Sequence, residues 1–251
     1  MKRMLAARVC PVIMCLLCVS FVTTSACLAQ DQDAPKKAQR KPAAARVNPA
    51  YEAPDVVEGL PHVLLIGDSI SIGYMLDVRE ALKGTANVWR PPTNCGPTTN
   101  GVQNLDKWLG DRKWDVIHFN FGLHDLKYMG PKGENLASPT APDSHQQVSL
   151  EDYGKNIRTI AERLKKAGRV VIWRETTPVP QGAAGRVPGD SAKYNAMAAK
   201  VIAEVGGIET DPMFSFAKEI ESTQRPANVH YTAEGSKKLG QHVAELIRKH
   251  L

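Results

Sequence analysis

The stretch His62-Val-Leu-Leu-Ile-Gly-Asp-Ser-Ile-Ser-Ile-Gly73 determines how the rest of the chain is interpreted. Its apolar run, residues 63–66, is short, contains β-branched residues and lies between Pro61 and Gly67. Such a run is typical of a strand that is buried on both faces. Gly67 allows a tight turn that places Ser69 at the carboxyl end of the strand, where open α/β sheets bind their ligands. Ser69 is therefore a candidate nucleophile, provided that a base lies nearby.

A bare Gly-Asp-Ser sequence also has a simpler interpretation, in which the polar residues form a turn and Ser69 caps the next helix. Two better-known motifs are excluded. The nucleophile elbow needs glycine at position 71, where this chain has Ser71, and no Gly-Lys-Ser/Thr ending of a phosphate-binding loop follows. The stretch alone thus leaves both a nucleophile and a helix cap open.

The amino terminus predicts a secretory signal peptide over residues 1–29. Three basic residues precede an apolar run at residues 11–22, and small residues up to Ala29 form a cleavage motif. The alternative is a lipoprotein signal acylated at Cys27, where the preceding Thr-Ser-Ala lacks the aliphatic residue expected of such a signal. We therefore expect a secreted or periplasmic protein, attached to a membrane only if Cys27 is lipidated.

Removal of the signal changes the composition of the chain. The formal charge falls from +6 to +3 because three basic residues leave, and four of the five cysteines leave with them. A chain so mildly basic is not expected to bind nucleic acid, and Cys95 alone cannot build a disulfide framework. Residues 30–58 are rich in alanine, proline and lysine, which predicts a disordered linker before a folded domain at residues 59–251.

Predicted strands and helices alternate through that domain, which indicates a parallel sheet with helices on both faces. The segment 127–149 has no periodicity and leaves the third strand at the same edge as Ser69, so we expect it to cover the site. The predicted strands lie at about 62–66, 87–90, 114–121, 169–173 and 208–210, and the predicted helices at about 70–83, 100–109, 151–167, 191–205 and 232–249.

Three further loops with reactive or hydrogen-bonding groups end at that edge of the sheet. Gly96, in Asn-Cys-Gly-Pro-Thr, can turn a backbone N–H toward a substrate oxygen. Gly-Leu-His-Asp follows the third strand and contains His124. His230 precedes the last helix and therefore lies in a loop, where a surface role is the alternative to a catalytic one. His118 lies within the third strand and is expected to be packed.

The order of these motifs resembles the four sequence blocks of the SGNH (GDSL-like) hydrolases, over about residues 60–251. The resemblance implies a flavodoxin-like three-layer α/β/α fold with a five-stranded parallel sheet in the order 2-1-3-4-5. It also implies a serine esterase. Ser69 corresponds to the nucleophile and to one oxyanion N–H donor, Gly96 corresponds to the second donor, and His230 to the general base.

Two positions depart from the family pattern. His124 stands where the family has an oxyanion-binding asparagine, and a neutral imidazole can still donate one N–H. Ala227 stands where the family has the aspartate that orients the base. Loss of that acid from an established triad costs roughly 10⁴-fold in rate. Asn228 is the nearest polar replacement, and Asp125 and Asp211 are more distant alternatives. For Asp125 a structural role is the other interpretation.

The sequence thus predicts an exported serine esterase that acts on acyl esters, with O-acetyl groups on carbohydrate as a substrate class suggested by analogy alone. Small esters and lysophospholipids remain alternatives. A non-catalytic glycan-binding or scaffold domain is the rival interpretation, supported by Ala227. No cofactor is expected. No metal is expected either, because His124 and Asp125 have no third ligand at a suitable spacing.

Overall fold

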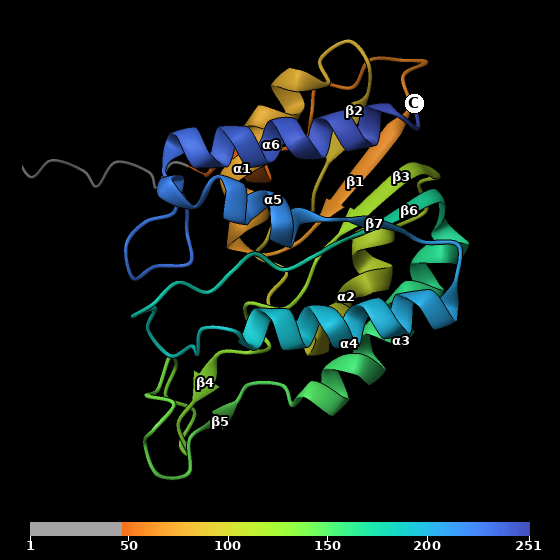
Figure 1. The fold of residues 1–251 in the computed structure, drawn as a ribbon. Helices are drawn as coiled ribbons and strands as arrows, with labels where there is room; N and C mark the ends of the chain where they lie inside the picture. The colour runs from red at the N-terminus through yellow and green to blue at the C-terminus, as the bar shows by residue number, and fades with distance from the viewer. Residues whose placement is uncertain (1–46) are drawn as a thin grey trace, which may run out of the picture. The chain divides into compact units, whose positions relative to one another are not determined.

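Five parallel strands form the central sheet of the computed structural model, which describes residues 47–251 (Figure 1). The expected signal peptide and residues 30–46 lie outside the described residues. In space the strands follow the order β2-β1-β3-β6-β7, which is the predicted 2-1-3-4-5 order along the sheet. The strands are β1 (His62–Ile66), β2 (Asn87–Trp89), β3 (Trp114–Phe119), β6 (Gly168–Arg174) and β7 (Glu209–Asp211).

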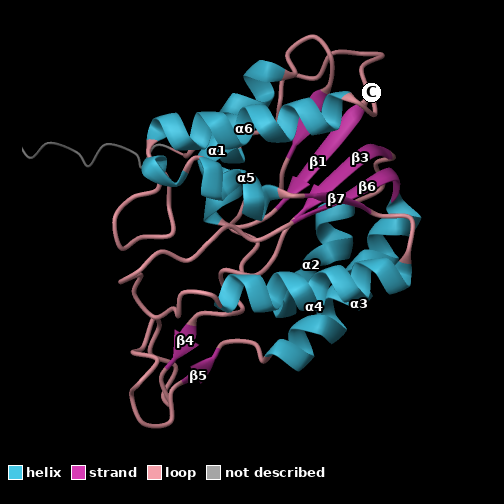
Figure 2. Cartoon of the chain, viewed as in Figure 1, coloured by secondary structure: helices cyan, strands magenta, loops and turns pink. Residues whose placement is uncertain are grey.

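Helices cover both faces of the sheet, and Figure 2 shows α1, α5 and α6 on one side with α2, α3 and α4 on the other. The three-layer α/β/α prediction is therefore confirmed. The helices are α1 (Ser69–Ala81), α2 (Thr98–Leu109), α3 (Leu150–Ala167), α4 (Asp190–Val205), α5 (Met213–Glu219) and α6 (Ala233–Arg248), with short 3-10 turns η1 (Pro49–Tyr51) and η2 (Glu221–Thr223).

The apolar patterns of the sequence account for this arrangement. Residues 63–66 of β1 are all buried, since β2 and β3 flank the strand and helices cover both of its faces. In α3 the residues spaced three or four apart, among them Tyr153, Ile157 and Leu164, are fully buried. Burial of each such side chain contributes about 1.5–3 kcal/mol relative to exposure. The core thus holds the loops at the carboxyl ends of the strands in fixed positions.

The segment at residues 47–58 corrects the predicted linker boundary. Ala50 in η1 is buried, and the N–H of Val57 donates to Asn87 Oδ1 at 2.8 Å. The guanidinium of Arg79 donates to the backbone oxygen of Glu52 at 2.6 Å. Pro49 begins a 3-10 turn that packs against α1, so the ordered part starts before residue 59.

The long segment 127–149 is also more ordered than its composition indicated. It contains a two-stranded antiparallel ribbon, β4 (Tyr128–Met129) with β5 (His145–Gln146). The N–H of Tyr128 donates to Gly185 O at 2.7 Å, which ties the ribbon to the loop after β6. The short helix α5 was not predicted, because seven residues give too little sequence for a helical period.

Candidate active site

Ser69 lies at the start of α1, directly beyond β1, and its hydroxyl meets a histidine from the far end of the chain. Asp68 caps the helix, because its Oδ1 accepts the N–H of Ile70 at 3.0 Å. The alternative in which Ser69 is the cap is therefore wrong. Ser69 Oγ lies 2.8 Å from Nε2 of His230, although 161 residues separate them. A Cβ on Gly67 would lie 2.9 Å from Ser71 Oγ, so this turn has no room for a side chain there.

A tight turn before α6 places the imidazole of His230. Residues 225–228 follow the type II pattern, with Pro226 at the second position, Ala227 at φ +51° and a hydrogen bond from the N–H of Asn228 to Arg225 O at 3.2 Å. Asn228 Oδ1 then lies 2.7 Å from His230 Nδ1 and accepts the backbone N–H of His230 at 3.0 Å. With a proton on Nδ1 donated to this oxygen, Nε2 can accept the hydroxyl proton of Ser69.

The surroundings of His230 favour its neutral form. Burial lowers the pKa of His230 below its ordinary value, the Asp68 carboxylate opposes this, and the cations Arg186 and Arg225 lower it further. An imidazole that is neutral at pH 7 has a free lone pair on Nε2. The geometry and the charge state therefore both suit a general base.

His124 is half-buried in the loop after β3. Asp68 and Arg186, which act on the pKa of His230, act on the pKa of His124 as well. Burial lowers its pKa, the Asp68 carboxylate raises it, and Lys127, Arg186 and, when protonated, His230 lower it. His124 is therefore neutral near pH 7. In that state one ring nitrogen carries a proton that can be donated to an oxyanion, as the sequence hypothesis requires.

Gly96 adopts a left-handed φ of +65°, which a glycine adopts without strain. Its N–H donates to Asn94 Oδ1 at 3.0 Å within the same loop. The loop lies beside the serine turn, since the N–H of Cys95 donates to Gly67 O at 3.3 Å. The structure thus brings Gly96 next to the turn that carries Ser69, but this N–H reaches an oxyanion only if it shares or releases its bond to Asn94.

Asp125 does not contact His230. Its Oδ1 accepts the backbone N–H of Thr98 at 2.8 Å and the hydroxyl of Thr98 at 2.5 Å. Burial raises the pKa of Asp125 to about 7, while the donors of Thr98 lower it. This carboxyl joins the loop after β3 to the start of α2, so its role is structural, which was the other interpretation of this residue.

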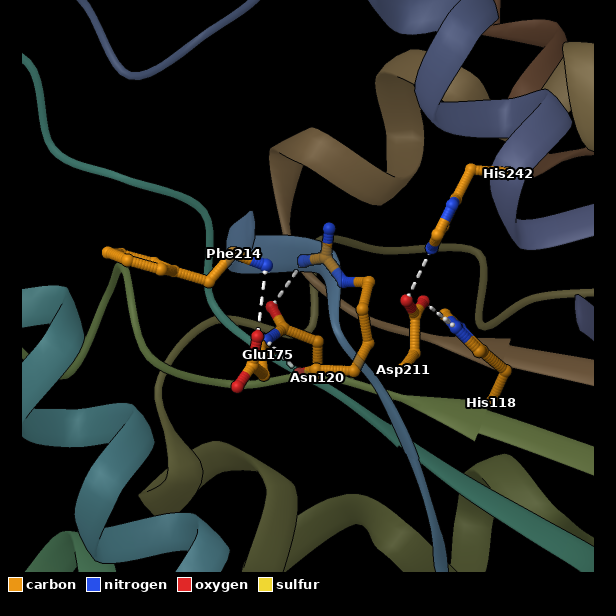
Figure 3. A network of polar contacts seen from close by, with 7 residues as sticks. His118, Asn120, Glu175, Asp211, Phe214 and His242 are labelled. Carbon is orange, nitrogen blue, oxygen red and sulfur yellow. Dashed lines mark hydrogen bonds and ion pairs between the residues drawn. The ribbon is translucent and has the colours of Figure 1, made fainter. Parts of the chain in front are cut away.

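Asp211 also serves another part of the molecule. It lies between two histidines, with His118 Nε2 at 2.9 Å and His242 Nε2 at 2.7 Å (Figure 3). Burial raises its pKa, but the bonds from the two histidines outweigh this and hold the pKa below the ordinary range. Asp211 therefore does not orient His230, and His118 is packed as expected. Asn228 is the residue that contacts the base.

A groove with a volume of about 670 Å³ opens beside Ser69 and His230, between α1 and α6. Its lining includes Arg225, Asp77 and Lys237. Sequence reasoning did not select Arg225 or Arg186, because no spacing pattern marks them. Within residues 47–251 no group of three or more His, Cys, Asp or Glu side chains could hold a metal ion. No helix in that range is long and apolar enough to cross a membrane.

Comparisons with known proteins identify the fold. No family model matches the chain, and no curated protein matches it. Solved structures do match. A lipase/acylhydrolase from Enterococcus faecalis has a TM-score of 0.60 at 16% identity, covering 76% of this chain and 96% of that one. An acetylxylan esterase from Geobacillus stearothermophilus has a TM-score of 0.59 at 16% identity, covering 74% and 94%.

A structure described as a GDSL-like lipase, from Parabacteroides merdae, has a TM-score of 0.57 at 14% identity and covers 74% of this chain and 94% of that one. At such identities the likeness concerns the fold. The chain therefore has the α/β/α fold of the SGNH-like hydrolases, and the resemblance noted in the sequence is confirmed at that level.

Proposed function

We propose that this protein is an exported serine esterase that hydrolyses acyl esters, with Ser69 as nucleophile and His230 as general base. The observation that carries the proposal is the chain of contacts from Ser69 Oγ to His230 Nε2 at 2.8 Å and from His230 Nδ1 to Asn228 Oδ1 at 2.7 Å. The fold shared with lipases and acetylxylan esterases supports it. Export rests on the signal peptide predicted at residues 1–29.

In this mechanism the Ser69 oxygen attacks the ester carbonyl carbon as its proton passes to His230 Nε2. The resulting imidazolium is stabilised by the hydrogen bond from Nδ1–H to Asn228. The C–O bond to the alcohol then breaks, and His230 returns the proton to the leaving oxygen. Water next attacks the carbonyl carbon of the acyl-serine while His230 accepts its proton; the bond from that carbon to Ser69 Oγ then breaks, His230 returns the proton to Oγ, and the free acid leaves.

Three donors surround the position of the oxyanion in this proposal. The N–H of Ser69 lies in the first turn of α1, where backbone N–H groups have no partner within the helix. His124 supplies a neutral imidazole N–H. Gly96 joins them when its N–H turns from Asn94 Oδ1. Loss of one such donor typically costs 10²–10³-fold in kcat.

The rival function is a non-catalytic binding domain on the same fold. Two observations favour it. The base contacts the amide of Asn228 and no carboxylate, and the N–H of Gly96 is already bonded to Asn94 Oδ1. A fluorophosphonate discriminates between the two functions, because it reacts with a serine only when a base activates the hydroxyl.

The test compares the wild type with Ser69→Ala, using 4-nitrophenyl acetate turnover and fluorophosphonate labelling. We expect labelling of the wild type alone and a loss of at least about 10³-fold in kcat/KM for the variant. Ser222→Ala removes an exposed hydroxyl from η2 and serves as the matched control. Equal rates for wild type and Ser69→Ala, with no labelling, favour the rival.

A further inference from the structure

Arg225 and Arg186 lie near enough to His230 for both charges to lower its pKa, and Lys127 lies near His124. Among the described residues no ion pair joins Arg225, Arg186 or Lys127 to an acid. Arg225 lines the groove together with the catalytic pair. Arg186 and Lys127 are near enough to His124 for both charges to lower its pKa. Asp68 acts on Arg186 and Asp125 acts on Lys127, so Arg225 is the cation in the groove that has no acid within ion-pair distance.

The far end of the same groove is balanced. Glu234 forms an ion pair with Lys238 at 2.7 Å, and the charge of Lys237 opposes the burial that raises the pKa of Asp77. Each acid there has a cation nearby. The groove cation without an acid beside it is thus Arg225, at the end that holds the reacting pair.

Both arginines are fixed beside the active-site histidines. Arg225 Nε donates at 3.1 Å to the carbonyl of Tyr231, which follows His230. Arg186 Nε donates at 3.0 Å to the carbonyl of Leu123, which precedes His124. In each guanidinium the Nε–H is used, while the Nη donors remain available to a ligand. The one exception is Arg186 Nη1, which has a long contact of 3.4 Å to the backbone oxygen of Ala184. A fixed guanidinium fork matches the two oxygens of a carboxylate.

This arrangement has a cost for the reaction. Arg186 and Arg225 both lower the pKa of His230 and so weaken it as a base. Asp68 is the opposing carboxylate, and its Oδ2 is buried without a partner in the described part of the chain. A neutral substrate leaves Arg225 without an anionic partner. An anionic group on the substrate neutralises it at the moment of binding.

We propose that the alcohol part of the substrate carries a carboxylate that binds Arg225 in the groove, with Arg186 and Lys127 adding attraction, and that the substrate is an O-acylated acidic saccharide. This inference rests on the proposed esterase function. Hydroxyl groups of such a saccharide would find hydrogen-bonding partners in Asp77, Glu234 and Ser236 along the groove. The charge of Arg225 selects the alcohol part of the substrate and does not distinguish one acyl group from another.

The test uses two aryl acetates that differ only in charge, 4-acetoxybenzoate and 4-acetoxybenzamide, with rates corrected for alkaline hydrolysis. A second pair, O-acetylated polygalacturonate and O-acetylated xylan, extends the test to saccharides. We expect the wild type to prefer the anionic member by about tenfold in kcat/KM, since hydrogen bonds to charged groups are stronger than neutral ones. Raising sodium chloride from about 50 to about 500 mM should reduce that preference.

Arg225→Gln should lower kcat/KM for the anionic ester about five- to tenfold more than for the neutral ester. Arg225→Lys, which keeps the charge, should retain part of the preference. Lys200→Gln makes the same charge change at an exposed position of α4 and should leave the preference as in the wild type.

The possible failures are distinguishable. Hydrolysis of both esters without any preference overturns the substrate inference and leaves the esterase function standing. A loss that is equal for both esters in Arg225→Gln also overturns it, because that result assigns Arg225 to positioning of His230. No turnover of either ester and no fluorophosphonate labelling overturn the esterase function and this inference together.

Discussion

The molecule contains two histidine sites that differ in the acceptor beside the ring. His230, half-buried at the groove, has the neutral amide of Asn228 at 2.7 Å. His118, wholly buried in the sheet, has the carboxylate of Asp211 at 2.9 Å, which it shares with His242. The charged acceptor thus stabilises a packed histidine in the core, while the histidine that contacts Ser69 has an uncharged one.

The difference follows from the charges around each site. Arg174 is paired in register with Asp211 and is fully buried, with Nη2 donating to Asn120 Oδ1 at 2.6 Å. Asp211 is the carboxylate in register with that buried cation, and its two oxygens bond to His118 and His242. At the groove the opposing carboxylate is Asp68, which lies at the turn that carries Ser69, and the bond to His230 Nδ1 needs only an oriented acceptor. The comparison separates two roles of an acceptor, namely charge compensation and orientation of the ring.

The largest effect is expected when the core acceptor is removed. Asp211→Ala leaves His118 without its acceptor and Arg174 without a nearby anion, so we expect a loss of about 3–5 kcal/mol in the free energy of unfolding. Urea denaturation measures it. Asp211→Asn keeps the shape and should lose less. If Asp211→Ala is as stable as the wild type, the charge-compensation role of Asp211 is wrong.

The second prediction concerns the acceptor at the groove. Asn228→Ala frees the ring of His230 and should lower kcat by about 10²-fold, with little change in KM, because the wrong tautomer and orientation become populated. Asn228→Asp places a carboxylate against Nδ1 and should raise kcat above that of the wild type, because it stabilises the imidazolium. Steady-state kinetics with 4-nitrophenyl acetate measure both variants. A wild-type rate in Asn228→Ala would exclude the orienting role.

The third prediction separates the two sites by pH. Burial lowers the pKa of His230, Asp68 opposes this, and Arg186 and Arg225 lower the pKa further. Because the imidazole must be neutral to act as a base, kcat/KM should persist below pH 6.5 and fall only in a more acidic range. Arg225→Gln removes one cation and should move that acidic limb upward by less than about one pH unit. His124→Asn removes the second ring, so a limb that survives this change belongs to His230.

The buried site should respond to pH in stability and not in rate. Burial lowers the pKa of His118 in the folded protein, and its bond to Asp211 only partly opposes this. The unfolded state therefore binds more protons below pH 6.5, and stability is full above that pH and declines as the pH falls toward the folded-state pKa. Urea titrations between about pH 5 and pH 8 test this direction. Asp125, whose pKa is raised to about 7, gives the opposite slope in this range, so the test is the difference in stability between the wild type and His118→Asn. A difference that moves in favour of the wild type on acidification would contradict the prediction.

Much of this arrangement was predictable from the sequence, for a physical reason. The apolar run of β1 and the spacing of Tyr153, Ile157 and Leu164 in α3 directly encode burial, and the strand order was inferred from the family resemblance. Ser69 was selected from the Gly-Asp-Ser motif, and Asn228 as the polar residue nearest to Ala227 in the last family block. Arg186 and Arg225 were not, since their positions depend on tertiary contacts with backbone carbonyls that leave no local pattern. The hydrogen bond from the N–H of Gly96 to Asn94 Oδ1 was not predicted either, since it depends on the folded shape of the loop.

The smallest effect is expected at the turn that holds the groove acceptor. Ala227 adopts φ +51°, which strains a residue with a Cβ, and no such strain is present at the core carboxylate. Ala227→Gly relieves the strain but adds freedom to the unfolded chain, so we expect a net gain of about 0.5 kcal/mol. Ala199→Gly, at an exposed position within α4, should instead cost about 1 kcal/mol. Thermal unfolding of the two variants should therefore shift in opposite directions, and a loss of stability in Ala227→Gly would mean that the turn, like the core site, depends on contacts of its side chain.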